Sequence, residues 1–471
     1  MLRPSVVFLF AVLAIVPFAA RAGAAPTYGA SSGARERGAS IDLAVADRTL
    51  KNGLLVLVQE DHSAPVVSSY VFYHCGSRNE RQGRTGIAHL FEHMMFNGGK
   101  KFGPGVFDDL IEGNGGSTNG YTSRDLTAYL NNFPREALPL VLDLESDRMA
   151  HLAITPQNLE QERGVVKEER RLRIDNEVSG VMDEALYLQA FVESPRRWNT
   201  IGFMSDLDRI TLDDARAYFA ACYAPNNATL VLAGDVVPAP TFTLVERYFG
   251  AIPRRKPPPP VDASEPAQDG ERRAAVRKNA ELPAVLVGYH GLRALDPQRP
   301  VLDVIERVLA GGESARLHQD LVREHELATG IGADNVWGID PDLFWVYVQA
   351  RPGKTAAELE HRIDAVMIRM ATEPVSAEEL ARAKNQLRAE LVRGLKTVSG
   401  KANQLGFFQT VFGDHRAIFR LEAEWEAVTV DDVRRLAATL LVPSQRTVIV
   451  LVPVPSGRPA SERMPTGGAV R

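Results

Sequence analysis

Cysteine is scarce in this sequence, with only Cys75 and Cys222 among 471 residues. A scaffold held together by many disulfides is therefore excluded. The two residues could pair in an oxidising compartment, but two cysteines in so long a chain are more often separate buried residues. The sequence leaves both states open. Because no cysteine precedes Cys75, lipid attachment to a cysteine near the N-terminus is excluded.

An excess of positive charge is also missing, since 54 Lys and Arg face 59 Asp and Glu and the net charge is -5. Nucleic-acid binding normally needs a basic patch, so we expect no nucleic-acid partner. After residue 25 no apolar run approaches the length that spans a membrane, so the mature chain is expected to be soluble. Its length predicts two or three domains.

The first 25 residues differ from the rest of the chain. Arg3 precedes an apolar run over residues 6–20, and the small residues around Ala22 and Ala24 are typical of a signal-peptide cleavage site. We expect an export signal cut after one of these alanines, and hence a periplasmic protein of a Gram-negative bacterium. The alternative is an uncleaved membrane anchor, for which the apolar run is short.

The chain repeats itself. The segment "ITLDDARAYFAACYAPNNATLVLAGDV", from Ile210, aligns without a gap with "VTVDDVRRLAATLLVPSQRTVIVLVPV", from Val428. The pairs with identical residues, each 218 positions apart, include Thr211 and Thr429, Asp213 and Asp431, Arg216 and Arg434, and Pro225 and Pro443. The same offset carries Pro65 and the apolar run after it onto Pro283 and its own apolar run. Two matches in one register indicate a duplicated domain.

The order of predicted elements favours two homologous α+β domains, each with an antiparallel or mixed β-sheet packed with helices. Alternating or apolar patterns predict strands over residues 54–60, 66–73, 229–233, 284–289, 344–350 and 447–452, and helical patterns cover 355–370 and 376–396. The proline-rich segment 253–276 predicts a stiff, exposed linker. We therefore expect an N-terminal domain over 41–252 and a C-terminal domain over 277–456.

The stretch "TGIAHLFEHMMF", residues 85–96, carries the pattern His-x-x-Glu-His. On a helix His89 and His93 lie one turn apart on one face, with Glu92 beside them. Two imidazoles in this arrangement can bind one cation while the carboxylate reaches a water on it. A polar surface helix is the alternative.

A hydrolytic zinc site needs a third protein ligand and an open position for water. In "ERGVVKEERR" Glu162 and Glu169 are two helical turns apart and share a face, whereas Glu168 points about 100 degrees away from Glu169. Taken alone, this stretch is more typical of a solvated charged helix.

Four segments together resemble the inverted-zincin metallopeptidases of the pitrilysin, insulinase and mitochondrial processing peptidase family. They are "GSRNERQGRTGIAHLFEHMMFNG", "NGYTSRDLTAY", "ERGVVKEE" and "YAPNNATLVLAGDV". The resemblance spans about residues 43–455. It implies that His89, His93 and Glu169 bind one Zn²⁺, that Glu92 is the general base, and that Glu162 orients a ligand imidazole.

The resemblance also implies a place for the substrate. The stretch "GGSTNGYTSRDLTAY" is similar to the edge strand on which this family lays an extended peptide, so Asn119, Gly120 and Tyr121 are expected to meet the substrate. A glycine-rich turn before a structural strand is the alternative. Pairing through the main chain suits unfolded or extended peptides and gives broad sequence preference.

The second half lacks the metal motif. At the 218-residue offset the four motif residues fall on Arg307, Ala310, Gly311 and Leu387. The family's second domain helps to close a chamber that needs four such domains, so the chain is expected to form half of a clamshell. Related sequences carry an arginine and a tyrosine that hold the substrate from across the chamber. Arg323 matches this arginine, but Thr329 stands at the tyrosine position.

This substitution leads to a hypothesis about partners. We expect the catalytic subunit of a heterodimer, with a homologous subunit that lacks His-x-x-Glu-His but carries the arginine and tyrosine. A homodimer that tolerates Thr329 is the alternative. A different function also stays open, because the same fold serves as a non-catalytic structural or chaperone-like subunit. The complete motif favours an exported zinc endopeptidase.

Overall fold

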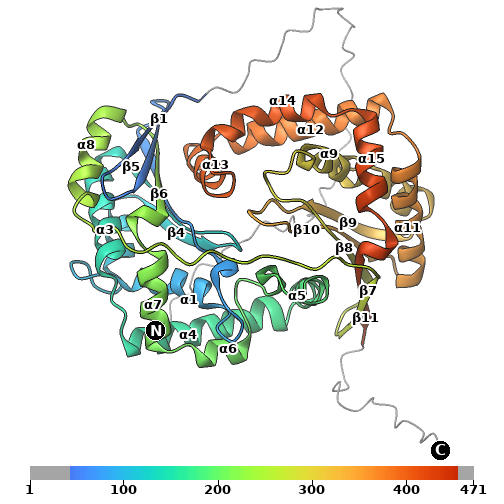
Figure 1. Ribbon diagram of the computed structural model, residues 1–471, viewed down its shortest axis with the longest axis horizontal. Coiled ribbons are helices and arrows are strands. Elements are labelled where there is room, and N and C mark those ends of the chain that lie inside the picture. Colours follow the sequence, from blue (N-terminus) through green and yellow to red (C-terminus); the bar gives the residue numbers. More distant parts are fainter. Residues whose placement is uncertain (1–42, 455–471) are drawn as a thin grey trace, which may run out of the picture. The chain divides into compact units, whose positions relative to one another are not determined.

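The computed structural model describes residues 43–454 (Figure 1). The expected export signal, its cleavage sites and the outermost domain limits at 41 and 456 lie outside these residues. Within the described range, no helix is both long enough and apolar enough to cross a membrane.

The first half of the chain forms a mixed sheet of six strands in the order β1-β2-β6-β3-β5-β4. These are β1 (Val45–Thr49), β2 (Leu55–Glu60), β3 (Val66–Tyr73), β4 (Ser117–Thr122), β5 (Thr127–Pro134) and β6 (Ala228–Gly234). β2 and β6 run parallel, and the other neighbours are antiparallel. β6 is buried throughout, as its apolar sequence predicts for a central strand, whereas the polar and glycine-containing β4 lies at the edge.

The second half repeats this plan with five strands in the order β7-β11-β8-β10-β9 (Figure 1). These are β7 (Arg272–Lys278), β8 (Ala284–His290), β9 (Ala328–Asn335), β10 (Leu343–Ala350) and β11 (Arg446–Pro453). Here β7 and β11 form the parallel pair, and β9 takes the edge position that β4 has in the first sheet. The α+β class and the repeated sheet are confirmed. Each strand and helix predicted from the sequence is present within two residues of its expected limits.

Each half contributes a helix to the sheet of the other half. Helix α5 (Val178–Ala190) packs on β7, β8 and β11, and helix α13 (Val398–Val411) packs on β3 and β6. Close contact requires glycine in α13, because a Cβ at Gly406 would lie 1.9 Å from Phe72 Cε2. The two halves therefore pack together through these two helices. The hydrophobic pattern of each helix does not predict which sheet the helix covers.

The proline-rich segment contains no helix or strand between residues 253 and 270. Its second part is bound to both halves. The Glu265 carboxylate accepts hydrogen bonds from the backbone N–H groups of Val192, Glu193 and Ser194 at 2.8 to 3.0 Å, and Gln268 Nε2 donates to the Arg446 carbonyl at 2.7 Å. The domain limits at 252 and 277 stay a prediction.

A buried ion-pair network also joins the two halves. Arg196 is 1% exposed, and its guanidinium donates to Asp125 at 2.7 and 2.9 Å and to Asp342 at 2.9 Å. Asp342 accepts a further hydrogen bond from the Tyr187 hydroxyl at 2.8 Å. Asp125 follows β4 and Asp342 precedes β10, so Arg196 ties the edge of the first sheet to the second sheet.

Replacement of Arg196 by methionine is expected to lower the free energy of unfolding by about 3–5 kcal/mol, because two buried carboxylates lose the cation that donates hydrogen bonds to both. The measurement is urea denaturation followed by circular dichroism. The matched control is Arg81→Met, whose side chain is 76% exposed and whose loss should cost less than about 1 kcal/mol. Equal unfolding midpoints for the two variants would contradict a stabilising role of the buried Arg196 ion pairs.

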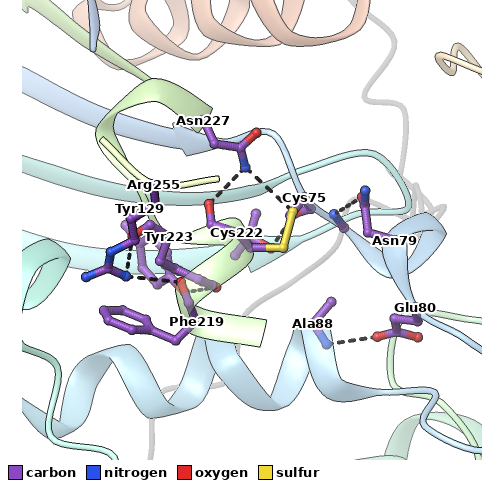
Figure 2. Close-up of a disulfide and its surroundings, with 12 residues drawn as sticks. Cys75, Asn79, Glu80, Ala88, Tyr129, Phe219, Cys222, Tyr223, Asn227 and Arg255 are labelled. Atoms are coloured by element: carbon purple, nitrogen blue, oxygen red, sulfur yellow. Dashed lines mark hydrogen bonds between the residues drawn. A yellow bond between two sulfur atoms is a disulfide. The ribbon is translucent and has the colours of Figure 1, made fainter. Parts of the chain in front are cut away.

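The two cysteines form a disulfide (Figure 2). Cys75 follows β3, Cys222 ends helix α7 (Leu212–Cys222), and their Cα atoms are 5.7 Å apart. Asn227 Nδ2 lies beside the bond and donates to the Cys222 carbonyl at 2.8 Å. Of the two states that the sequence leaves open, the paired one is present. They are 147 positions apart in sequence. They meet because β6, which follows Cys222, pairs with β3, which precedes Cys75.

Candidate metal and peptide site

Helix α1 (Ile87–Met94) carries the motif, and its apolar residues are buried in the core of the first half. The helix begins after Gly86, where a Cβ would lie 2.2 Å from the Ile201 carbonyl oxygen and φ is +87°. Only glycine fits there. The Glu80 carboxylate accepts a hydrogen bond from the Gly86 N–H at 3.0 Å. It accepts another from the Ala88 N–H at 2.8 Å (Figure 2). Two backbone N–H groups at the start of α1 thus have a hydrogen-bond acceptor, and the first turn of the helix is held in place.

The three predicted ligands lie together. His89 and His93 project from α1, and Glu169 projects from α4 (Pro156–Arg170), which packs against α1. Glu169 Oε2 is 3.1 Å from His93 Nε2 and 3.7 Å from His89 Nε2. One ligand atom from each residue lies within 4.8 Å of the other two. Glu168 points away, as expected, and its side chain is 68% exposed.

The geometry and chemistry of this group fit zinc. Tetrahedral bonds of about 2.0–2.1 Å place ligand atoms roughly 3.3 Å apart, and the distances of Glu169 Oε2 to the two imidazoles are close to that value. Two imidazoles and one carboxylate are also a typical ligand set of hydrolytic zinc, which leaves a fourth position for water. His89, His93 and Glu169 are therefore the residues that could hold the ion.

The electrostatics of the site favour a cation. Burial lowers the pKa of His89 to about 3, so its imidazole is neutral, the form that coordinates a metal. Burial would also lower the pKa of His93, but the neighbouring carboxylates of Glu162 and Glu169 raise it to about 10. Burial raises the pKa of Glu169, yet its hydrogen bond with His93 brings that pKa down to about 2. A positive charge is therefore favoured among these carboxylates.

Glu162 lies on the other side of His93. Its Oε2 is 3.6 Å from His93 Nδ1, while its Oε1 accepts a hydrogen bond from Asn97 Nδ2 at 3.0 Å. This is the position from which a carboxylate can orient a ligand imidazole. Sequence reasoning missed Asn97, and the short spacing of this residue to the motif was the only available signal.

Glu92 lies beside the candidate ligands, with its Oε2 3.9 Å from His89 Nε2. The Thr122 hydroxyl donates a hydrogen bond of 2.6 Å to the same oxygen. Burial raises the pKa of Glu92 to about 7, against the opposing effect of this hydrogen bond. Such a value suits a group that takes and returns a proton near neutral pH. Thr122 was also missed, because nothing in its local sequence identifies its partner.

The structure separates the three predicted substrate residues. Among the described strands β4 pairs only with β5, so its outer edge offers main-chain groups to a peptide. Gly120 faces the motif, since a Cβ there would lie 3.2 Å from Glu92 Cγ. Tyr121 points to the other face, where its hydroxyl donates to Asn403 Oδ1 of α13 at 2.7 Å. Asn119 lies on β4 one residue before Gly120.

Arg323 lies in the second half, in a short π-helix, Gln319–Glu324. It is exposed, and its Nη2 donates to Glu313 Oε2 at 2.7 Å. No hydrogen bond or ion pair between described residues joins it to the motif. Thr329 stands on the edge strand β9, where its hydroxyl faces the Ala350 carbonyl at 3.3 Å.

The counterparts of the motif in the second half lie on α9 (Arg299–Ala310), just after it, and on α12 (Ala377–Gly394). Arg307 there pairs with Glu390 at 2.6 Å. The other described group that could hold a cation is Asp320, Glu324 and His325. The Asp320 carboxylate already accepts hydrogen bonds from Arg362 and Arg369, so it is neutralised by protein groups.

Two family models match the chain. The model described as insulinase (peptidase family M16) covers residues 55–201, and the model described as peptidase M16 inactive domain covers residues 209–387. The first contains the complete motif, and the second covers the half that lacks it.

Known proteins resemble the chain over most of its length. Zinc protease PqqE of Helicobacter pylori is 31% identical over 409 residues, which is 86% of this chain and 92% of that protein. Mitochondrial-processing peptidase subunit beta of Blastocladiella emersonii is 25% identical over 86% of this chain and 88% of its own. A protease from H. pylori has the same fold, with a TM-score of 0.83, 30% identity and coverage of 87% and 100%. The periplasmic protease PqqL from Escherichia coli aligns with a TM-score of 0.73 and 19% identity over 88% of this chain and 48% of that chain.

Proposed function

The chain belongs to the insulinase family of peptidases, peptidase family M16, and we propose that it is a zinc-dependent endopeptidase that hydrolyses extended or unfolded peptides. One observation carries this proposal. His89, His93 and Glu169 place their ligand atoms within 4.8 Å of one another, with Glu92 beside them. An inert scaffold has no need of this arrangement.

In the proposed reaction, His89, His93 and Glu169 hold the ion and Glu92 moves the proton. Bound zinc would polarise the scissile carbonyl and lower the pKa of the attacking water. Glu92 accepts a proton from that water and passes it to the leaving amine. Glu162 keeps the His93 ring in its binding orientation through Nδ1.

The edge of β4 is the proposed place for the peptide. An extended peptide can add there as another strand, with Asn119, Gly120 and Tyr121 on the strand that it meets. Because main-chain pairing ignores most side chains, broad preference among unfolded peptides follows. Arg323 is kept as a proposed contact from the second half to a substrate in an assembled chamber.

Substitution of Gly120 by alanine is expected to lower kcat about tenfold while stability changes little. The new Cβ would lie 3.2 Å from Glu92 Cγ and 3.3 Å from Tyr129 Cδ1, so Glu92 must shift by a few tenths of an ångström. Steady-state cleavage of a quenched peptide measures the effect. The control is Gly113→Ala at the end of α2 (Val106–Gly113), where no atom lies within 4 Å of the new Cβ. A full-rate Gly120→Ala enzyme would contradict this placement of Glu92.

The partner is proposed to be a homologous subunit that lacks the metal motif and carries the arginine and tyrosine. Thr329 in place of the tyrosine supports this heterodimer, and a relative named as a subunit of the mitochondrial-processing peptidase agrees with a divided assembly. A homodimer is the alternative. Native mass measurement of the complex from its source separates the two, because a complex of identical chains only would exclude the heterodimer.

The proposed location is the periplasm, after removal of an N-terminal signal peptide. The Cys75–Cys222 disulfide supports it, because such bonds persist in oxidising compartments. A periplasmic protease of the same fold is compatible with this location.

The alternative function is that of a non-catalytic structural or chaperone-like subunit. The match to the inactive-domain model fits this alternative, but it covers only residues 209–387.

The test uses the full mature chain, alone and in the complex isolated from its source. An unfolded peptide and the same sequence within a folded protein are offered as substrates, and the products are identified by mass spectrometry. Internal cleavage of the unfolded peptide, lost with a chelator and restored by zinc, is the expected result. Stable peptide binding with no cleavage by the complex would favour the non-catalytic alternative.

A further inference from the structure

We propose that Thr122 is the residue that positions Glu92 for catalysis, and that it links the peptide-binding strand directly to the general base. This inference rests on the proposed function and deepens it. Thr122 is the last residue of β4, and its side chain is turned inward to the motif rather than to the substrate edge.

The contact is short and enclosed. Thr122 is 1% exposed, and its hydroxyl donates to Glu92 Oε2 at 2.6 Å. A threonine is stiff about its first side-chain torsion, so a buried threonine hydroxyl is a well-fixed donor. The carboxylate is thus held through its Oε2 atom.

The strand that carries Thr122 is itself anchored to α1. β4 pairs with β5, where Gly120 lies opposite Tyr129 and Thr122 opposite Thr127. The Tyr129 hydroxyl donates to the Phe91 carbonyl of α1 at 3.3 Å, and the Thr127 hydroxyl donates to the Cys75 carbonyl at 3.0 Å. The position of Thr122 relative to Glu92 is therefore fixed through the neighbouring strand.

Alternation along β4 explains why one strand can serve both roles. Gly120 and Thr122 face α1, while Tyr121 between them faces α13. Gly120 leaves room for the Glu92 side chain, and Thr122 binds its carboxylate. The position of a peptide paired to the outer edge of β4 would then be fixed relative to Glu92 by this strand.

The experiment compares Thr122→Ala and Thr122→Ser, which differ only in the hydroxyl, together with the isosteric Thr122→Val. All are made in the full chain, in its native complex. The alanine and valine variants are expected to lower kcat about 10- to 100-fold, because a hydrogen bond to a charged group is lost, with KM within about twofold of wild type. The serine variant should remain within about threefold of the wild-type kcat, and all variants should retain wild-type zinc content.

Several results would overturn the inference. Equal losses in Thr122→Ser and Thr122→Ala would show that shape rather than the hydroxyl matters. A raised KM at unchanged kcat would assign Thr122 to peptide binding, and wild-type rates in the alanine and valine variants would leave it without a role. If wild type itself shows no Glu92-dependent cleavage, the proposed function fails and this inference with it. If wild type cleaves and depends on Glu92, only the role of Thr122 is in question.

Discussion

Replacement of Glu92 by glutamine is expected to lower kcat for peptide cleavage by about 10²- to 10⁴-fold. Glutamine has the same shape and can still accept the hydrogen bond from Thr122, but its amide cannot take a proton from water. Because Glu92 is not among the three candidate ligand residues, zinc content should remain at the wild-type level. Cleavage of a quenched unfolded peptide and elemental analysis of the same samples give both quantities.

The matched control is Glu168→Gln. Glu168 is also a glutamate next to a candidate ligand in sequence, but its side chain is 68% exposed and pairs with Arg171, just after α4. Its loss should change kcat by less than about twofold, as expected for a surface ion pair. A Glu92→Gln enzyme with more than a tenth of wild-type activity would contradict the role of Glu92 as base. Loss of zinc from that variant would show that Glu92 helps to hold the ion, which we do not expect.

Removal of the disulfide is expected to have the largest effect on stability. The bond closes a loop across 147 positions, and the chain-entropy relation gives about 5 kcal/mol for a loop of that length. Measured effects are often smaller, so Cys75→Ser/Cys222→Ser should lower the free energy of unfolding by about 3–5 kcal/mol. Urea denaturation of wild type and variant under non-reducing conditions measures the difference.

A reductant provides the control for this prediction. Dithiothreitol should lower the unfolding midpoint of wild type towards that of the double serine variant and should leave the variant unchanged. The thiol content of the unfolded, unreduced chain is a second readout, and it should be zero. Two free thiols per chain would contradict the pairing of Cys75 and Cys222.

The motif was predictable because its geometry is local. His89, Glu92 and His93 share one helical face whatever surrounds them, and the two-turn spacing of Glu162 and Glu169 is equally local. That α4 should pack beside α1 did not follow from periodicity and came from the family resemblance. Thr122 and Asn97 were missed because their partners are set by the packing of a strand and a short 3₁₀ helix against these helices.

The repeated sheets were predictable because apolar strands recur at a constant offset, and the structure gives them the same order. The exchange of α5 and α13 between the halves was not predictable. An amphipathic pattern shows that a helix has a buried face, but it does not identify the sheet that covers this face. The disulfide depended on the same missing information, since the separation of Cys75 and Cys222 in sequence says nothing about their distance in space.

The proposed zinc site is tested most directly by the zinc content of the purified full chain beside that of His93→Ala and Glu169→Gln, measured by elemental analysis after dialysis against metal-free buffer. This measurement needs neither a substrate nor a partner. We expect about one zinc per wild-type chain and less than about a tenth of that in either variant. A wild-type chain that retains no divalent metal, or variants that retain as much as wild type, would contradict the proposed zinc site.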